Sequence, residues 1–96
     1  MKEVSIDQLC NAVESTHECS ASLREAVPVL EKFNGRPVWE GVVHVFDVDH
    51  PDTNTCYAWS SPIDGTDRRR FYAVLGIPPI NSPVDAIRAS IVAENK

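Results

Sequence analysis

The sequence contains no long apolar run, little glycine and no excess of basic charge, and each absence excludes a class of protein. Its longest apolar stretches fall well short of the ~20 residues that a membrane-spanning helix needs. Only four glycines are present, and no glycine-rich phosphate loop, GxSxG or HExxH motif occurs. The net charge of -5 argues against a general nucleic-acid binder, because such domains are usually basic.

Cysteine is scarce as well, at three residues, and no CxxC pair is present. The odd count argues against a framework of disulfides. The first ten residues hold no apolar segment of signal-peptide length, so we expect the thiols to stay reduced. These observations predict a cytoplasmic protein, and we expect no cofactor and no resident metal.

The remaining composition is that of an ordinary globular chain. The sequence has 96 residues, of which 43% are hydrophobic and 24% are charged. This length and composition predict a single domain that spans residues 1–96. The acidic side chains are concentrated in the N-terminal half, so we expect that half to be electronegative.

Helices are predicted at both ends of the chain. Ser5 and Gln8 have the spacing of a capping box, and apolar residues at helical intervals follow to about His17. Near the C-terminus, Ser82 is a typical N-cap and is followed by proline at the first helical position. We therefore expect helices over about residues 6–17 and about 83–94.

A second apolar stripe at helical spacing covers residues 23–33 and ends at Asn34-Gly35. It predicts another helix, which Pro28 would kink because proline lacks the backbone donor. Two interpretations stay open: one bent helix together with the first segment, or two separate helices.

From Pro37 the pattern changes to β-branched residues and alternation. Strands are predicted from Val38 to Val48, from Thr55 to Ser60 and from Arg68 to Ile77. Short connections favour antiparallel neighbours, which gives a three-stranded meander. The predicted fold is α+β, with a three-stranded antiparallel β-meander, an N-terminal helix or helices and a C-terminal helix, in the order α(α)βββα.

Alternation makes both faces of this sheet apolar. Val42 and Phe46 point one way with His44, whereas Val43 and Val45 point the other way. A solvated face would instead be polar at every second position. Either the helices divide between the faces, or a second copy, a partner or a ligand covers one of them. On this basis we predict a homo-oligomer, at least a dimer.

The first hairpin predicts a candidate ligand site. If residues whose numbers sum to about 103 face one another, Phe46 faces Tyr57 and His44 faces Trp59. The third strand then adds either Phe71 and Arg69, or Arg70 and Tyr72. Such a cluster suits a small anionic or aromatic molecule, and its alternative is a core or a dimer seam. The predicted ligand-binding residues are His44, Phe46, Tyr57, Trp59, Arg70 and Tyr72; no catalytic residue is assigned.

Three other groups of residues resemble cation, metal or nucleophile sites, but each is better explained by a structural role. The acids and histidine at 47–52 suit a turn better than a cation loop, because the calcium-loop pattern is absent. Cys10, Glu14 and His17 share a helix face, but no second ligand pair supports a metal site. The register places Cys56 away from His44, which disfavours a nucleophilic dyad.

Arg68-Arg69-Arg70 is the one basic run of the chain. Its guanidinium groups are of the kind that binds phosphate or carboxylate. The simpler interpretation is the beginning of a strand, with arginines divided between its faces.

The stretch WEGVVHVFDV, followed by CYAW and RRRFYAVLGIPPI, is similar to short uncharacterised bacterial proteins carried on integron mobile gene cassettes. The resemblance covers about Trp39 to Glu94. It implies a small α+β bacterial protein, often oligomeric, with no assigned activity and no site residues to transfer.

These observations favour a binding or interaction module. One alternative is a small enzyme that acts on a compact anionic substrate, with His44 as acid or base. Another is an antitoxin-like or regulatory partner protein, whose acidic N-terminal helices dock on a basic surface. Neither a nucleic acid nor a membrane is an expected partner.

Overall fold

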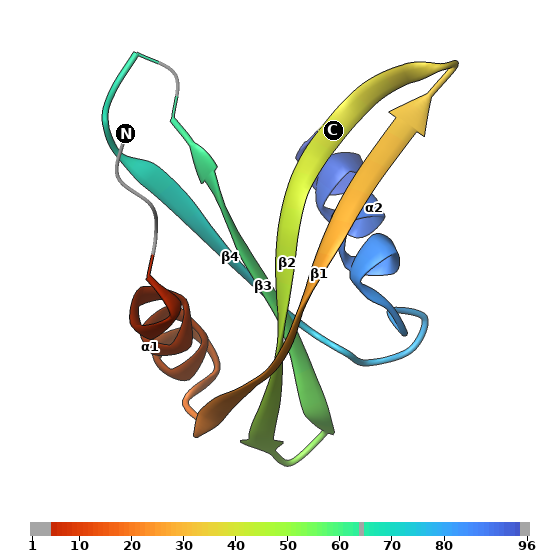
Figure 1. Cartoon of the computed structure of the whole chain (residues 1–96). Coiled ribbons are helices and arrows are strands. Elements are labelled where there is room, and N and C mark those ends of the chain that lie inside the picture. The colour runs from red at the N-terminus through yellow and green to blue at the C-terminus, as the bar shows by residue number, and fades with distance from the viewer. Residues whose placement is uncertain (1–4, 64, 95–96) are drawn as a thin grey trace.

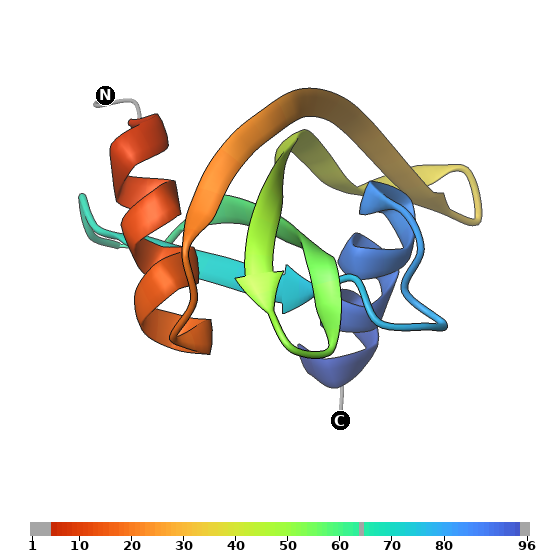
Figure 2. The same ribbon diagram turned by 90° about the horizontal axis from the view of Figure 1, so that it is seen from below.

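The computed structural model describes residues 5–63 and 65–94. In chain order its elements are α1 (Ile6–His17), β1 (Ala21–Phe33), β2 (Arg36–His50), β3 (Thr53–Pro62), β4 (Arg69–Leu75) and α2 (Pro83–Glu94) (Figure 1). The strands form one antiparallel sheet in the order β1-β2-β3-β4. The sheet is strongly curled, with α1 on one side and α2 on the other (Figure 2). No described helix is long and apolar enough to cross a membrane.

The predicted three-stranded meander and the order α(α)βββα are wrong. Within the described residues the sheet has four strands, and the extra strand is β1, which occupies the segment predicted as a second helix. The segment up to Phe33 therefore forms neither one bent helix nor two helices. Instead, α1 ends at His17, and an extended strand follows.

Two sequence features explain why this segment is a strand. Pro28 would break a helix interior, but an edge strand accommodates it, and β1 lies at the sheet edge. Asn34 and Gly35 both have positive φ, 53° and 77°, and they join β1 to β2 between the paired residues Phe33 and Arg36. Two residues with positive φ are typical of a type I′ hairpin turn, so Asn34-Gly35 turns a hairpin and does not terminate a helix.

The predicted first helix is confirmed, together with its cap. The Ser5 hydroxyl accepts from the Gln8 amide at 3.1 Å, and the Ser5 amide donates to the Gln8 side chain at 3.0 Å. Leu9 and Val13 are the buried residues of α1. This reciprocal cap fixes where the helix begins, and the apolar stripe fixes which face packs on the sheet.

The C-terminal helix is confirmed as well. The Asp85 amide donates to the Ser82 hydroxyl at 3.2 Å, as the sequence pattern at Ser82 and Pro83 predicts. Ala86 and Ile87 are buried in α2. The Arg88 side chain donates to Glu31 at 2.8 Å and so ties α2 to β1.

The apolar character predicted for both sheet faces is explained by a core on each side. On the α1 face, Leu9 and Val13 pack with Phe46, Cys56 and neighbouring side chains. The α2 face has its own core, made up of Val29, Val43, Val45, Tyr57, Trp59, Ala86 and Ile87. The helices thus divide between the two faces, which was one of the two alternatives open from the sequence.

Candidate functional site

The structure does not bring the six predicted ligand-binding residues together. Phe46 lies opposite Cys56, and Val45 lies opposite Tyr57, so paired numbers sum to 102 and not to 103. A shift of one residue moves a whole set of side chains to the other face of a sheet. His44 and Phe46 therefore lie on the α1 face, whereas Tyr57 and Trp59 lie on the α2 face.

The aromatic half of the predicted site is part of the core on the α2 face. The Trp59 ring stacks on Tyr72, with centroids 5.1 Å apart, and contacts Trp39 edge-on at 6.2 Å. Trp59 is 1% exposed, so its ring fills the space between the sheet and α2. Arg70 lies opposite Ser61, on the same face as Tyr72, and is exposed. Of the two predicted alternatives for β4, Arg70 and Tyr72 are the pair that shares a face with Trp59.

His44 marks the limit of the core on the α1 face. Phe46, two residues along β2, is fully buried, whereas His44 is half-buried. Its Nδ1 atom is enclosed and has no hydrogen-bond partner. Burial lowers the pKa of His44 below its usual value, so the imidazole is neutral at pH 7. An uncharged ring at this point suits an apolar surface.

Beyond His44 the α1 face of the sheet is uncovered. Pro28 lies directly opposite Val42 on this face, and Leu30 occupies the next position along β1. Leu30 is 48% exposed, Val42 is 45% exposed and Phe71 of β4 is 38% exposed. We call these uncovered positions of the α1 face the open patch; its residues are Ala26, Pro28, Leu30 and Val42 on β1 and β2, and Phe71 on β4, all exposed.

The cross-strand register shows where the cover by α1 stops. Phe46, Cys56 and Leu75 form one row across the sheet and pack in the core with α1. The next row runs from Ala26 through His44 and Ala58 to Ala73. Leu23 and Ala26, the β1 residues of these two rows, are exposed at the sheet edge, whereas Ala58 is buried. Apart from Ala26, the open patch lies beyond this row, where the β1–β2 arm (residues 26–44) and the β3–β4 arm (residues 58–62 and 69–73) diverge (Figure 1).

Cys10, Glu14 and His17, which share one face of α1, hold this helix against the sheet. The Cys10 thiol donates to the Ala21 carbonyl at 3.2 Å, and the Glu14 carboxylate accepts from the Ala21 amide at 3.0 Å. His17 Nε2 hydrogen-bonds to the Ala73 carbonyl oxygen, 2.8 Å away. Among the described residues, no group of His, Cys, Asp and Glu is arranged to hold a metal ion.

The thiol of Cys56 is unsuited to nucleophilic chemistry. Burial raises the pKa of Cys56 to about 12, so the thiolate is rare at neutral pH. His44 lies opposite Ala58 and not opposite Cys56. The disfavoured Cys56–His44 dyad therefore has neither the thiolate nor the cross-strand pairing it would need.

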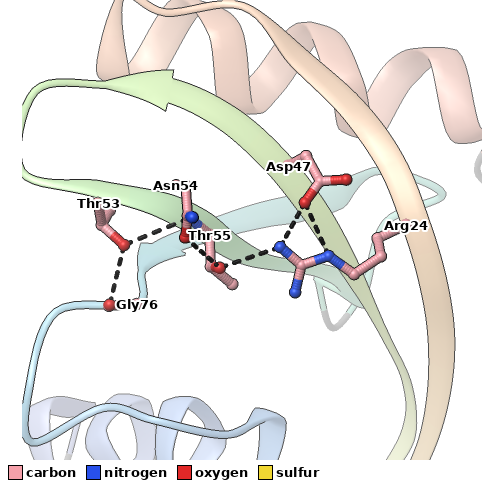
Figure 3. Close-up of polar contacts among 6 residues, drawn as sticks. All are labelled: Arg24, Asp47, Thr53, Asn54, Thr55 and Gly76. Atoms are coloured by element: carbon pink, nitrogen blue, oxygen red, sulfur yellow. Dashed lines mark hydrogen bonds and ion pairs between the residues drawn. The ribbon is translucent and has the colours of Figure 1, made fainter.

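A polar network beside the β2–β3 hairpin joins three strands (Figure 3). Arg24 donates from Nε to Asp47 at 2.7 Å and from a terminal nitrogen to Asp47 and to Thr55. The Thr53 hydroxyl donates to the Gly76 carbonyl at 3.0 Å. Because Arg24 lies at a register shift of β1, the network fixes the local path of the edge strand. The network also gives a structural role to Asp47, one of the acids near the turn, as the ion-pair partner of Arg24.

The arginine run does not form one anion site. Arg69 lies on the α1 face, where its Nε donates to the Ser60 hydroxyl at 2.9 Å. Arg70 lies on the opposite face. Division between faces is the simpler of the two interpretations of the run, and it leaves Arg69 at the border of the open patch.

The open patch is the surface that sequence reasoning missed. Because a helix was predicted for residues 23–33, the pairing of Pro28 with Val42 was not predicted. The missed signal was Asn34-Gly35 between alternating segments, a pattern that strongly favours a hairpin. Interpreted in that way, the sequence places Leu30 and Val42 on one face of a β1–β2 hairpin.

Neither protein-family models, nor curated proteins, nor solved structures give a match to this chain. The resemblance to integron cassette proteins therefore stays a prediction from the sequence.

Proposed function

We propose that the protein is a small interaction module that binds another protein through the open patch. The observation that carries the proposal is the exposure of Leu30, Val42 and Phe71 on a sheet face whose other part, around Phe46 and Cys56, is buried beneath α1. Large apolar side chains that their own chain leaves uncovered on a sheet face are typical of interaction sites. In the described residues, α1 covers one part of this face and leaves the other to solvent.

Charged groups border the patch in the manner of a protein interface. Glu40 lies opposite Leu30 on the same face, and Arg69 lies two residues before Phe71 on β4. Interfaces commonly have an apolar centre, from which charge is depleted, within a polar rim. The neutral His44 at the inner edge keeps the centre free of charge.

The alternatives are less well supported. An enzyme with His44 as acid or base would need an imidazole that takes up a proton near neutral pH, and burial lowers the pKa of His44. An aromatic pocket would need open rings, but Trp59 is buried in the core of the α2 face. An antitoxin-like module would use acidic N-terminal helices, and one of the two predicted segments is β1.

We also propose that the protein works in the cytoplasm. Cys10, Cys19 and Cys56 are free thiols in the structure. Free thiols persist in reducing compartments, where disulfides are rare. This proposal and that of an interaction module are independent of each other.

Photo-crosslinking in living cells tests the interaction surface. In full-length protein, Val42→benzoylphenylalanine is expected to give a discrete adduct of higher mass on irradiation, because a partner covers that position. The matched control is the same replacement at Val92 of α2, which is 60% exposed and lies outside the patch. We expect no adduct at Val92. An absence of adduct at Val42, or equal adducts at both positions, would contradict the proposal.

A further inference from the structure

We infer that the occupant of the open patch is a second copy of this chain, turned by a two-fold rotation. In this arrangement the β1–β2 arm of each copy lies on the β3–β4 arm of the other. The inference rests on the proposed function, since it names the partner of the same surface.

The patch has the composition that a two-fold interface requires. Such an interface uses one surface twice, so residues that meet must both belong to that surface. Val42 and Leu30 provide apolar area on the β1–β2 arm, and Phe71 provides it on the β3–β4 arm. Rotation about an axis parallel to the strands, outside the sheet and above the α1 face, exchanges the arms and turns these apolar groups of the two copies toward one another.

Charge complementarity favours the same arrangement. Glu40 borders the patch on the β1–β2 arm, and Arg69 borders it on the β3–β4 arm. The rotation brings Glu40 of one copy toward Arg69 of the other, and it does so twice. Among the described residues Glu40 has no ion-pair partner within its own chain.

Arg69 is held in place for this contact. Its Nε donates to the Ser60 hydroxyl and a terminal nitrogen donates to the Ser60 carbonyl at 3.3 Å. A guanidinium group has five donors, so further donors are left for a carboxylate. A fixed guanidinium loses less conformational entropy on binding than a free one.

The edge of the sheet favours contact through the face and not strand-to-strand pairing. β1 is an edge strand, and Pro28 lies in its middle. Proline has no amide hydrogen to donate to a strand of another chain, which is a common protection of sheet edges. A second copy that meets the β1–β2 arm is therefore expected to stack on its face instead of extending the sheet at β1.

Sedimentation equilibrium of the purified full-length chain tests the inference. Across the micromolar range we expect the mass to rise from that of one 10.6 kDa chain to that of two. Glu40→Arg places like charges together twice, so we expect the dimer to dissociate at least ~10-fold more readily. Arg69→Glu combined with Glu40→Arg is expected to restore the dimer, because the pair is reversed. Val42→Asp is expected to abolish it.

A single-chain mass at every concentration would overturn the inference. If crosslinking at Val42 still gave an adduct of another mass, the interaction surface would stand and only the identity of its partner would be wrong. A dimer insensitive to both Glu40→Arg and Val42→Asp would overturn the arrangement. Glu40→Gln, an uncharged variant at the same exposed position, is expected to weaken the dimer less than Glu40→Arg does.

Discussion

Trp59→Ala is expected to lower the free energy of unfolding by about 3–5 kcal/mol, the usual cost of removing a large buried aromatic side chain. Trp59 is 1% exposed and contacts the rings of both Trp39 and Tyr72. Its removal leaves a cavity between the sheet and α2, and both neighbouring rings lose a partner. Such a loss is a large share of the stability of a domain of this size.

Chemical denaturation followed by circular dichroism measures this effect. The control is Trp59→Phe, which keeps an aromatic ring and is expected to cost less than half as much. A loss below about 1 kcal/mol for Trp59→Ala would show that the ring is not part of the core, because surface substitutions have effects of that size. The predicted ligand pocket around Trp59 would then need to be reconsidered.

Phe46→Ala and Phe71→Ala form a matched pair, because both phenylalanines lie on the α1 face of the sheet. Phe46 is fully buried and packs in the core beneath α1, whereas Phe71 is 38% exposed in the open patch. Phe46→Ala is expected to cost about 3–5 kcal/mol of unfolding free energy, and Phe71→Ala about 1 kcal/mol or less.

The comparison is made by urea denaturation at protein concentrations low enough to keep the chain monomeric. Linkage to a dimer would otherwise add to the apparent cost of Phe71→Ala. Equal costs for the two substitutions would show that α1 covers both positions, or neither. Either result would contradict the boundary that defines the open patch.

Helix ends were predictable from the sequence because their signals are local. The capping box of Ser5 and Gln8, and the Ser82 cap followed by Pro83, each depend on groups within four residues. Such local hydrogen bonds satisfy the free amides of a helix N-terminus whatever the rest of the chain does. Both helices therefore lie where the sequence placed them.

The strand β1 was not predictable from periodicity alone. Leu23, Val27 and Leu30 fit a helical stripe, yet in the structure Val27 and Val29 face α2, while Leu23 and Leu30 are exposed. What decides the segment is the hairpin with β2, a set of contacts made along the whole strand. Pro28 and Asn34-Gly35 indicated an edge strand and a hairpin, whereas the apolar spacing indicated a helix.

The register of the β2–β3 hairpin was wrong by one residue for a similar reason. A register shift between Asp47 and His50 changes the offset between the strands near the turn. Such a shift depends on the local backbone path, which residue types do not determine. This single residue separates His44 from Trp59 and divides the predicted ligand site between two faces.

The division of the helices also changes the argument for self-association. The sequence favoured a dimer because both sheet faces are apolar: if the helices covered one face, a second copy could cover the other. The structure gives each face a helix, and one part of the α1 face keeps exposed apolar side chains, at Leu30, Val42 and Phe71. The case for a second copy now depends on specific residues: Val42 and Phe71, which are apolar and exposed on separate arms, and Glu40 and Arg69, which have opposite charges beside them.

Solvent accessibility of methyl groups at two protein concentrations tests the central claim most directly. A soluble gadolinium chelate broadens the NMR signals of methyl groups that it can approach. In dilute protein we expect strong broadening for Leu30, Val42 and Val92, all of which are exposed. In concentrated protein we expect Leu30 and Val42 to be protected, while Val92 stays as accessible as before. Unchanged broadening of Leu30 and Val42, or equal protection of Val92, would contradict association through the open patch.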